Sequence, residues 1–162
     1  MTRRVLGIDP GTAVTGYGVI EPLPNRLGRL VECGVLRTRA RAPLPERLDT
    51  LFTGVVELLA THQPEVVAVE GIFYAKNVRT SLTMSHARGV ILLAAVQGGA
   101  TVVELPPAVV KKAVVGRGRA TKGQVAYMVQ QLLRLQKPPA PADAADGVAI
   151  ALAHLLLRGR RR

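Results

Sequence analysis

Val5-Leu6-Gly7-Ile8-Asp9-Pro10-Gly11-Thr12 is the stretch of sequence that decides the fold. Its apolar residues are strand formers and Pro10-Gly11 is a turn signal, so the stretch predicts a buried strand that ends just after Asp9. The turn alone allows another interpretation, in which the aspartate only accepts hydrogen bonds from its own loop. The positions of the other acidic residues decide between the two.

The runs that follow predict the rest of a sheet. Two further strands, expected over 15–21 and 29–37, follow at hairpin distance, so the first three strands form an antiparallel meander. A helix opened by Pro43 and Pro45 separates them from a fourth strand, 66–70. Because the path from the third to the fourth strand crosses a whole helix, the pairing there is expected to be parallel.

The second half of the chain adds a fifth strand and three helices. Thr121 and Gln124 have the spacing of a capping box, which predicts a helix start. The expected elements are a helix over 81–97, a strand over 101–105, a helix from 121 and a last helix over 142–157. The sequence therefore predicts an α/β fold, a five-stranded mixed sheet flanked by helices. We expect one domain over 1–157 and a basic C-terminal tail over 158–162.

The charge of the chain indicates its partner. The 162 residues include 22 Lys and Arg against 11 Asp and Glu, a formal net charge of +11. Such an excess predicts a polyanionic partner, of which nucleic acid is the commonest, although a merely soluble basic surface is the alternative. The length fits one domain with a core of its own.

Several classes of protein are excluded by what the sequence lacks. A single cysteine, Cys33, rules out zinc binding by Cys/His spacing and is expected to be a small core or edge residue. The apolar run behind the basic start breaks at Asp9, too early for a secretory signal. The longest apolar stretches, 89–96 and 147–157, fall short of the ~20 residues of a membrane span. We expect a soluble, cytoplasmic protein.

Four acidic residues stand apart from those on solvated faces. Asp9 and Glu70 each end a strand, and if the two strands are neighbours their ends lie about 5 Å apart. Asp143 and Asp146 share one face of the first turn of the last helix. Each has an ordinary explanation on its own: acids in a first turn complement the helix dipole, and Glu70 could pair with a basic neighbour.

A cluster of the four requires cations. Two unit charges 4 Å apart repel by about 4 kcal/mol at an effective dielectric near 20, so the acids cannot share a pocket unaided. Carboxylate ligands suit Mg²⁺ or Mn²⁺. Two such ions would clamp the attacking water and the leaving oxygen of a phosphodiester displacement. The pattern predicts a nuclease with Asp9, Glu70, Asp143 and Asp146 as its catalytic, metal-binding residues.

Candidate nucleic-acid contacts surround these acids. Phe73 and Tyr74 follow Glu70 in a polar loop, where an aromatic ring could stack on an unpaired base, although either ring could instead enter the core. Gly116 and Gly118 let a cation-rich segment bend close to a backbone, with a solvated charged loop as the alternative. The predicted basic and polar contacts are Lys76, Asn77, Arg79, Lys111, Lys112, Arg117, Arg119 and Lys122.

Taken together and in order, the motifs of this chain resemble the RuvC family of bacterial Holliday junction resolvases, in the RNase H-like superfamily. The resemblance runs from Val5 to His154. It is carried by Gly7-Ile8-Asp9-Pro10-Gly11, Thr15-Gly16-Tyr17-Gly18, Glu70 with Phe73, Ala75-Lys76-Asn77, Ala87-Arg88-Gly89, Val114-Val115-Gly116 and Asp143-Ala144-Ala145-Asp146.

The resemblance implies a homodimer that nicks two opposed strands of a four-way junction symmetrically, with two Mg²⁺ per site or Mn²⁺ in their place. It implies a role in recombination and repair beside a branch-migration helicase complex. By position the four acids match the catalytic acids, Phe73 matches the aromatic that stacks at the junction centre, and Lys111 and Lys122 match basic residues near the cleaved strand. Some members carry histidine where this chain has Asp143. The apolar helix after Ser81 is the candidate dimer contact.

Three other functions compete with this one. An actin-like or sugar-kinase ATPase also begins with a strand and Asp-x-Gly-Thr, but it needs a second lobe that 162 residues cannot hold. An RNase H-like enzyme acting on RNA would share Asp9, whereas Phe73 and the Asp143/Asp146 pair favour junction DNA. A non-catalytic junction binder gains nothing from carboxylates facing its phosphates.

Overall fold

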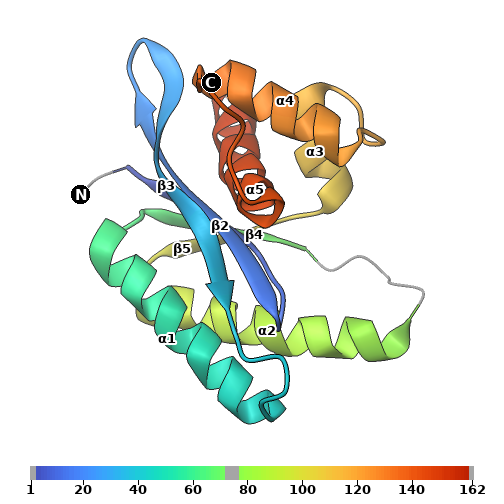
Figure 1. Cartoon of the computed structure of the whole chain (residues 1–162). Coiled ribbons are helices and arrows are strands. Elements are labelled where there is room, and N and C mark those ends of the chain that lie inside the picture. Colours follow the sequence, from blue (N-terminus) through green and yellow to red (C-terminus); the bar gives the residue numbers. More distant parts are fainter. Residues whose placement is uncertain (1–2, 72–76, 161–162) are drawn as a thin grey trace.

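A five-stranded mixed sheet in the order β3-β2-β1-β4-β5 forms the centre of this computed structural model, which describes residues 3–71 and 77–160 (Figure 1). The antiparallel meander is confirmed. The fourth strand is parallel as expected, but β4 pairs with β1 and β5 and not with β3, which lies at the edge of the sheet. The strands are β1 (Val5–Asp9), β2 (Val14–Leu23), β3 (Arg26–Arg37), β4 (Val66–Glu70) and β5 (Thr101–Leu105).

Helices cover both faces of the sheet. Figure 1 shows α1 and α2 together on one face, and α5 crossing the other face beside α3 and α4. Each face has its own apolar core, because β1 sends Val5 into one core and Leu6 and Ile8 into the other. The helices are α1 (Leu44–His62), α2 (Val78–Gln97), α3 (Pro107–Val115), α4 (Lys122–Leu133) and α5 (Ala142–Gly159).

The helix α3 is absent from the sequence-based prediction. Pro106-Pro107 reads as the end of a strand, yet Pro107 occupies the first turn of α3, where proline is favoured because its missing N–H has no helical partner there. Lys111 and Lys112 therefore lie on a helix instead of a flexible loop. The helix ends at Gly116, whose φ of 90° is left-handed.

Several boundaries differ from the predicted ones. The hairpin strands β2 and β3 extend further, because only Pro24 and Asn25 separate them. The helix α2 starts at Val78 instead of Ser81, since the Asn77 side chain caps its first turn. The last helix continues to Gly159, and Arg158 reaches Glu65 with an Nη1–Oε1 distance of 3.7 Å. The predicted capping box at Thr121 is confirmed.

Among the helices of residues 3–71 and 77–160, we find none that combines the length and the apolar character needed to cross a membrane.

Candidate active site

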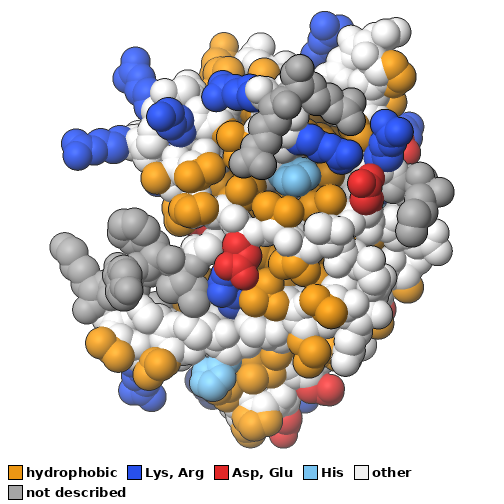
Figure 2. Space-filling model, turned by 180° about the vertical axis from the view of Figure 1, so that it is seen from behind, with side chains coloured by type: hydrophobic (Ala, Val, Ile, Leu, Met, Phe, Trp, Pro, Cys, Tyr) orange, Lys and Arg blue, Asp and Glu red, His pale blue; other side chains and the backbone are white. Residues whose placement is uncertain are grey.

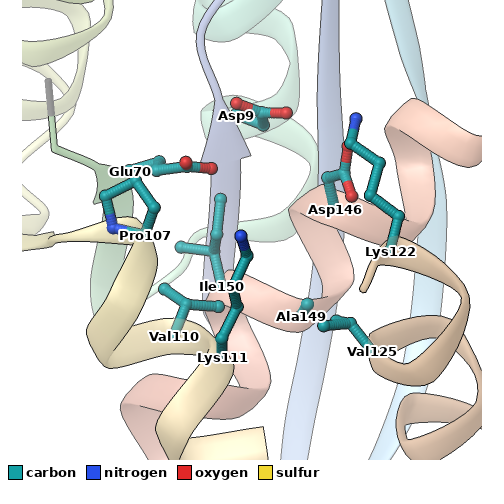
Figure 3. Close-up of a pocket in the computed structure, with 10 residues that line it drawn as sticks. All are labelled: Asp9, Glu70, Pro107, Val110, Lys111, Lys122, Val125, Asp146, Ala149 and Ile150. Atoms are coloured by element: carbon teal, nitrogen blue, oxygen red, sulfur yellow. The ribbon is translucent and has the colours of Figure 1, made fainter. Parts of the chain in front are cut away.

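Asp9 and Glu70 lie at the same edge of the sheet because β1 and β4 are parallel neighbours. Ile8 pairs with Val69 in the register, so the next residue of each strand carries the acid. Both side chains line one pocket, and Figure 3 shows them extending toward each other from adjacent strand ends. The two strands are thus neighbours, which is the condition under which the sequence places Asp9 and Glu70 close together.

The first turn of α5 brings two more carboxylates to this edge. One carboxylate oxygen from each of Asp9, Asp143 and Asp146 lies within 4.8 Å of the others. Asp146 also lines the pocket that holds Asp9 and Glu70 (Figure 3). The structure thus brings all four sequence-predicted acids together at one end of β1.

Burial and mutual repulsion disfavour the ionised acids. Burial, followed by the charges of Glu70 and Asp146, raises the pKa of Asp9 to about 8. Burial also raises the pKa of Glu70, while a hydrogen bond from Asp9 partly offsets the rise. Without a cation, Asp9 is therefore harder to ionise than an ordinary aspartate.

Two lysines reach the same pocket, one from α3 and one from α4. The Nζ of Lys122 lies 3.3 Å from Oδ2 of Asp146, and the charge of Asp146 raises the pKa of Lys122. Lys111 lines the pocket from α3 (Figure 3). The pocket has a volume of about 150 Å³, and its remaining lining residues are Pro107, Val110, Val125, Ala149 and Ile150.

The donor set fits divalent cations. Carboxylate oxygens are the ligands that Mg²⁺ and Mn²⁺ prefer, and at least three of them converge here. The raised pKa of Asp9 shows that its carboxylate lacks a full set of compensating charges. A cation with two positive charges would supply them, whereas one lysine shared with Asp146 does not.

The predicted nucleic-acid contacts fall into two groups. Phe73, Tyr74 and Lys76 lie outside the described residues. The others lie on described elements: Lys111 and Lys122 line the pocket, Lys112, Arg117 and Arg119 are exposed on and after α3, and Arg79 is exposed at the start of α2. Figure 2 shows Lys and Arg side chains protruding from the part of the molecule that carries α3 and α4.

Asn77 has a structural role that the sequence-based prediction did not assign. Its Oδ1 accepts hydrogen bonds from the backbone N–H groups of Arg79 and Thr80, at 3.0 and 3.4 Å. Asparagine at this position is a common helix cap. Its predicted contact with DNA stays a prediction.

The residues that stabilise the turn after Asp9 were not predicted from the sequence. The Oγ1 of Thr15 donates to the carbonyl of Gly11 at 2.6 Å and accepts from its N–H at 3.1 Å. From α1, Arg47 donates to the carbonyl of Thr12 at 3.3 Å and to its Oγ1 at 2.9 Å. No local pattern identifies Arg47, because its partner lies 35 residues away.

Carboxylates gathered at the end of the central strand of such a mixed sheet place the protein in the RNase H-like class of nucleases. Within that class the assignment is specific. The family model described as crossover junction endodeoxyribonuclease RuvC matches residues 5–154, so the chain belongs to the RuvC family.

Individual relatives agree with the family model. A crossover junction endodeoxyribonuclease RuvC from Pelotomaculum thermopropionicum is 52% identical over 150 residues, which cover 93% of this chain and 91% of the relative. The Thermus thermophilus RuvC structure has a TM-score of 0.89 and 35% identity, covering 98% of this chain and 96% of that one. Another structure shows T. thermophilus RuvC with a Holliday junction substrate; its TM-score is 0.88, its identity is 33%, and the coverage is 97% and 96%.

Proposed function

We propose that this protein is a Holliday junction resolvase, an endodeoxyribonuclease that cuts two opposed strands of a four-way DNA junction. The observation that carries the proposal is the convergence of Asp9, Glu70, Asp143 and Asp146 at one strand end in a chain of the RuvC family. The reaction is hydrolysis of a phosphodiester bond in each of the two strands.

The four acids are proposed to hold two Mg²⁺ ions, for which Mn²⁺ can substitute. When bound, the ions supply activation of the attacking water and stabilisation of the leaving oxygen. Asp9 is central because its carboxylate is within reach of acids from both β4 and α5. Occupation of the site requires Asp9 to lose its proton, since the ligands are carboxylates.

The lysines handle the charge of the substrate. Lys111 and Lys122 border the acids from α3 and α4, so each ammonium group can bind the phosphate that is cut. Val110, Val125 and Ile150 form an apolar side of the pocket that limits the access of bulk water. The two lysines position the scissile phosphate and balance its charge, while the acids hold the ions.

The substrate of the proposal is four-way junction DNA. Its support is the likeness to T. thermophilus RuvC, whose structure was solved with a Holliday junction substrate. The net charge of +11 and the exposed Lys112, Arg117 and Arg119 on and after α3 favour a polyanion. Cytoplasmic location and work beside a branch-migration helicase complex are parts of the same proposal.

A homodimer would place two such sites on one junction, and α2 is the proposed contact. Val78, Leu82, Leu93 and Val96 are 53–73% exposed. At 3.6 residues per turn they form one stripe along the helix. Gly89 lies in this stripe, and a Cβ there would meet nothing within 4 Å. An exposed apolar stripe with a small central residue suits the close approach of a second copy of α2.

Cleavage of labelled synthetic DNA tests the substrate class. We expect Mg²⁺-dependent nicks in a four-way junction, and at most weak nicking of a linear duplex or an RNA/DNA hybrid of the same sequence. Preferred cutting of the hybrid would instead support an enzyme acting on RNA. Tight junction binding without nicks in Mg²⁺ or Mn²⁺ would contradict the proposal.

A further inference from the structure

Gly16 occupies the position directly opposite the central acid. In the antiparallel register of β1 and β2, Asp9 pairs with Gly16, so a side chain at 16 would point to the same face of the sheet as that of Asp9. That face is covered by α5. A Cβ built at Gly16 would lie 1.8 Å from the backbone carbonyl oxygen of Asp143. The backbone of Asp143 therefore rests directly on the strand that pairs with Asp9.

The contact at Gly16 is one end of a longer seam between α5 and the sheet. A Cβ at Gly18 would lie 2.6 Å from the Cα of Val148. A Cβ at Gly147 would lie 2.4 Å from the Cα of Tyr17, and one at Gly7 would lie 2.2 Å from the carbonyl of Gly147. The backbone of α5 thus packs on β1 and β2 without intervening side chains.

We propose that Gly16 is a positioning residue of the metal site, because its missing side chain sets how closely Asp143 and Asp146 approach Asp9. The inference rests on the proposed function only in that the acids bind divalent cations. Gly16 has no side chain and so offers no ligand to the ions. It acts through the backbone of Asp143, the first acid of α5.

The short distance at Gly16 means that an added side chain would displace α5 by a measurable amount. A carbon and a carbonyl oxygen pack no closer than roughly 3.3 Å, so from 1.8 Å an alanine moves the first turn of α5 by about 1.5 Å. The carboxylates of Asp143 and Asp146 move with it. Since Mg²⁺ and Mn²⁺ ligands lie at 2.0–2.2 Å or so with little tolerance, such a shift disrupts their coordination.

The experiment measures Mn²⁺ binding by calorimetry without DNA, and junction binding in EDTA. For Gly16→Ala we expect Mn²⁺ affinity to fall by about tenfold or more, in line with the cost of misplacing ligands. Junction affinity in EDTA should stay within about twofold of the unaltered protein, because the basic surface is untouched. Unchanged Mn²⁺ affinity in folded Gly16→Ala would overturn the inference.

Gly28→Ala is the matched control for a general loss of stability. Gly28 lies in β3. A Cβ there would lie 2.7 Å from Cγ2 of Ile20 and 3.0 Å from the backbone carbonyl of Glu21, and it would meet none of the four clustered acids. We expect this variant to unfold at a lower temperature and to bind Mn²⁺ as the unaltered protein does. Equal losses of Mn²⁺ affinity in the Gly16 and Gly28 variants would contradict a positioning role.

A second substitution distinguishes the displacement of a metal ligand from a general loss of structure. Asp143→Glu lengthens the displaced acid, so it should weaken Mn²⁺ binding in the unaltered protein and partly restore it beside Gly16→Ala. If Gly16→Ala does not fold, Gly18→Ala, at the next close contact between α5 and the sheet, takes its place in the test. We expect its Mn²⁺ affinity to fall by about threefold. A folded Gly18→Ala with full affinity would then overturn the inference. No Mn²⁺ binding by the unaltered protein would instead refute the proposed metal site.

Discussion

Lys122 on α4 donates a hydrogen bond to Asp146 on α5, with Nζ 3.3 Å from Oδ2, although its side chain is 80% exposed. An exposed ion pair of this kind contributes little to stability, so the contact has another consequence. In the protein without ions, the ammonium partly neutralises an acid that the proposed cations would use.

Lys122→Gln separates the two roles of this lysine. We expect cleavage of the junction at saturating Mg²⁺ to slow by about tenfold or more, since a phosphate-binding charge is lost. Mn²⁺ affinity without DNA should not weaken, because a competing cation is removed. Lys137→Gln, at an exposed position after α4, is the control and should change neither quantity. Weakened Mn²⁺ binding with normal cleavage would contradict this account of Lys122.

The raised pKa of Asp9 predicts how stability depends on pH. The pKa of the Asp9 carboxyl is about 8 in the folded protein, against an ordinary value of 3.8. The folded state therefore binds the Asp9 proton more tightly than the unfolded state does. This proton binding stabilises the fold in acid, and the stabilisation is lost as pH rises toward 8. In EDTA we expect the melting temperature to fall as pH rises from about 5 to about 9. Scanning calorimetry measures this.

Asp9→Asn is the control for that dependence. The amide cannot ionise, so the variant should lose less stability with rising pH and should melt above the unaltered protein at high pH in EDTA. Added Mn²⁺ should stabilise the unaltered protein more than the variant, since the ion binds the folded state. Identical pH profiles for the two proteins would show that Asp9 is not the responsible group.

Arg47→Met tests the support of the turn after Asp9. The guanidinium donates three hydrogen bonds to Thr12 and Thr38 in the part of the chain that the structure describes. Their loss should lower the free energy of unfolding by about 1–3 kcal/mol, measured by urea denaturation. Arg41→Met, at an exposed position in the loop before α1, should lose less than about 0.5 kcal/mol. Equal effects of the two substitutions would contradict a special role for Arg47.

Leu93→Glu tests the proposed dimer contact. A charge within the apolar stripe of α2 should convert a dimer into a monomer in sedimentation experiments, because it would be buried without a partner. Paired nicks in a junction should become single nicks. Val56→Glu, on α1 and 40% exposed, is the control and should stay dimeric. A dimeric Leu93→Glu variant would place the contact elsewhere.

Local patterns were enough to predict the sheet and the grouping of the four acids at one of its edges. The run ending at Asp9, the helix crossed before Glu70 and the first-turn spacing of Asp143 and Asp146 each follow from short-range chemistry. Residues that act through distant partners were not predictable. Gly16 reads as an ordinary strand glycine until α5 is seen to rest on it, and Arg47 reads as a solvated helix residue. The helix α3 was missed because Pro106-Pro107 is compatible with both a strand end and a helix start.

The most direct test of the central claim compares junction cleavage by the unaltered protein with that of Asp9→Asn, Glu70→Gln, Asp143→Asn and Asp146→Asn. Each protein is assayed in Mg²⁺, Mn²⁺ and EDTA, with junction binding measured in parallel. We predict paired, metal-dependent nicks by the unaltered protein, and loss of cleavage by about a hundredfold or more in the variants with binding retained. Near-normal nicking by Asp9→Asn would contradict the claim that these carboxylates form a metal-dependent catalytic site.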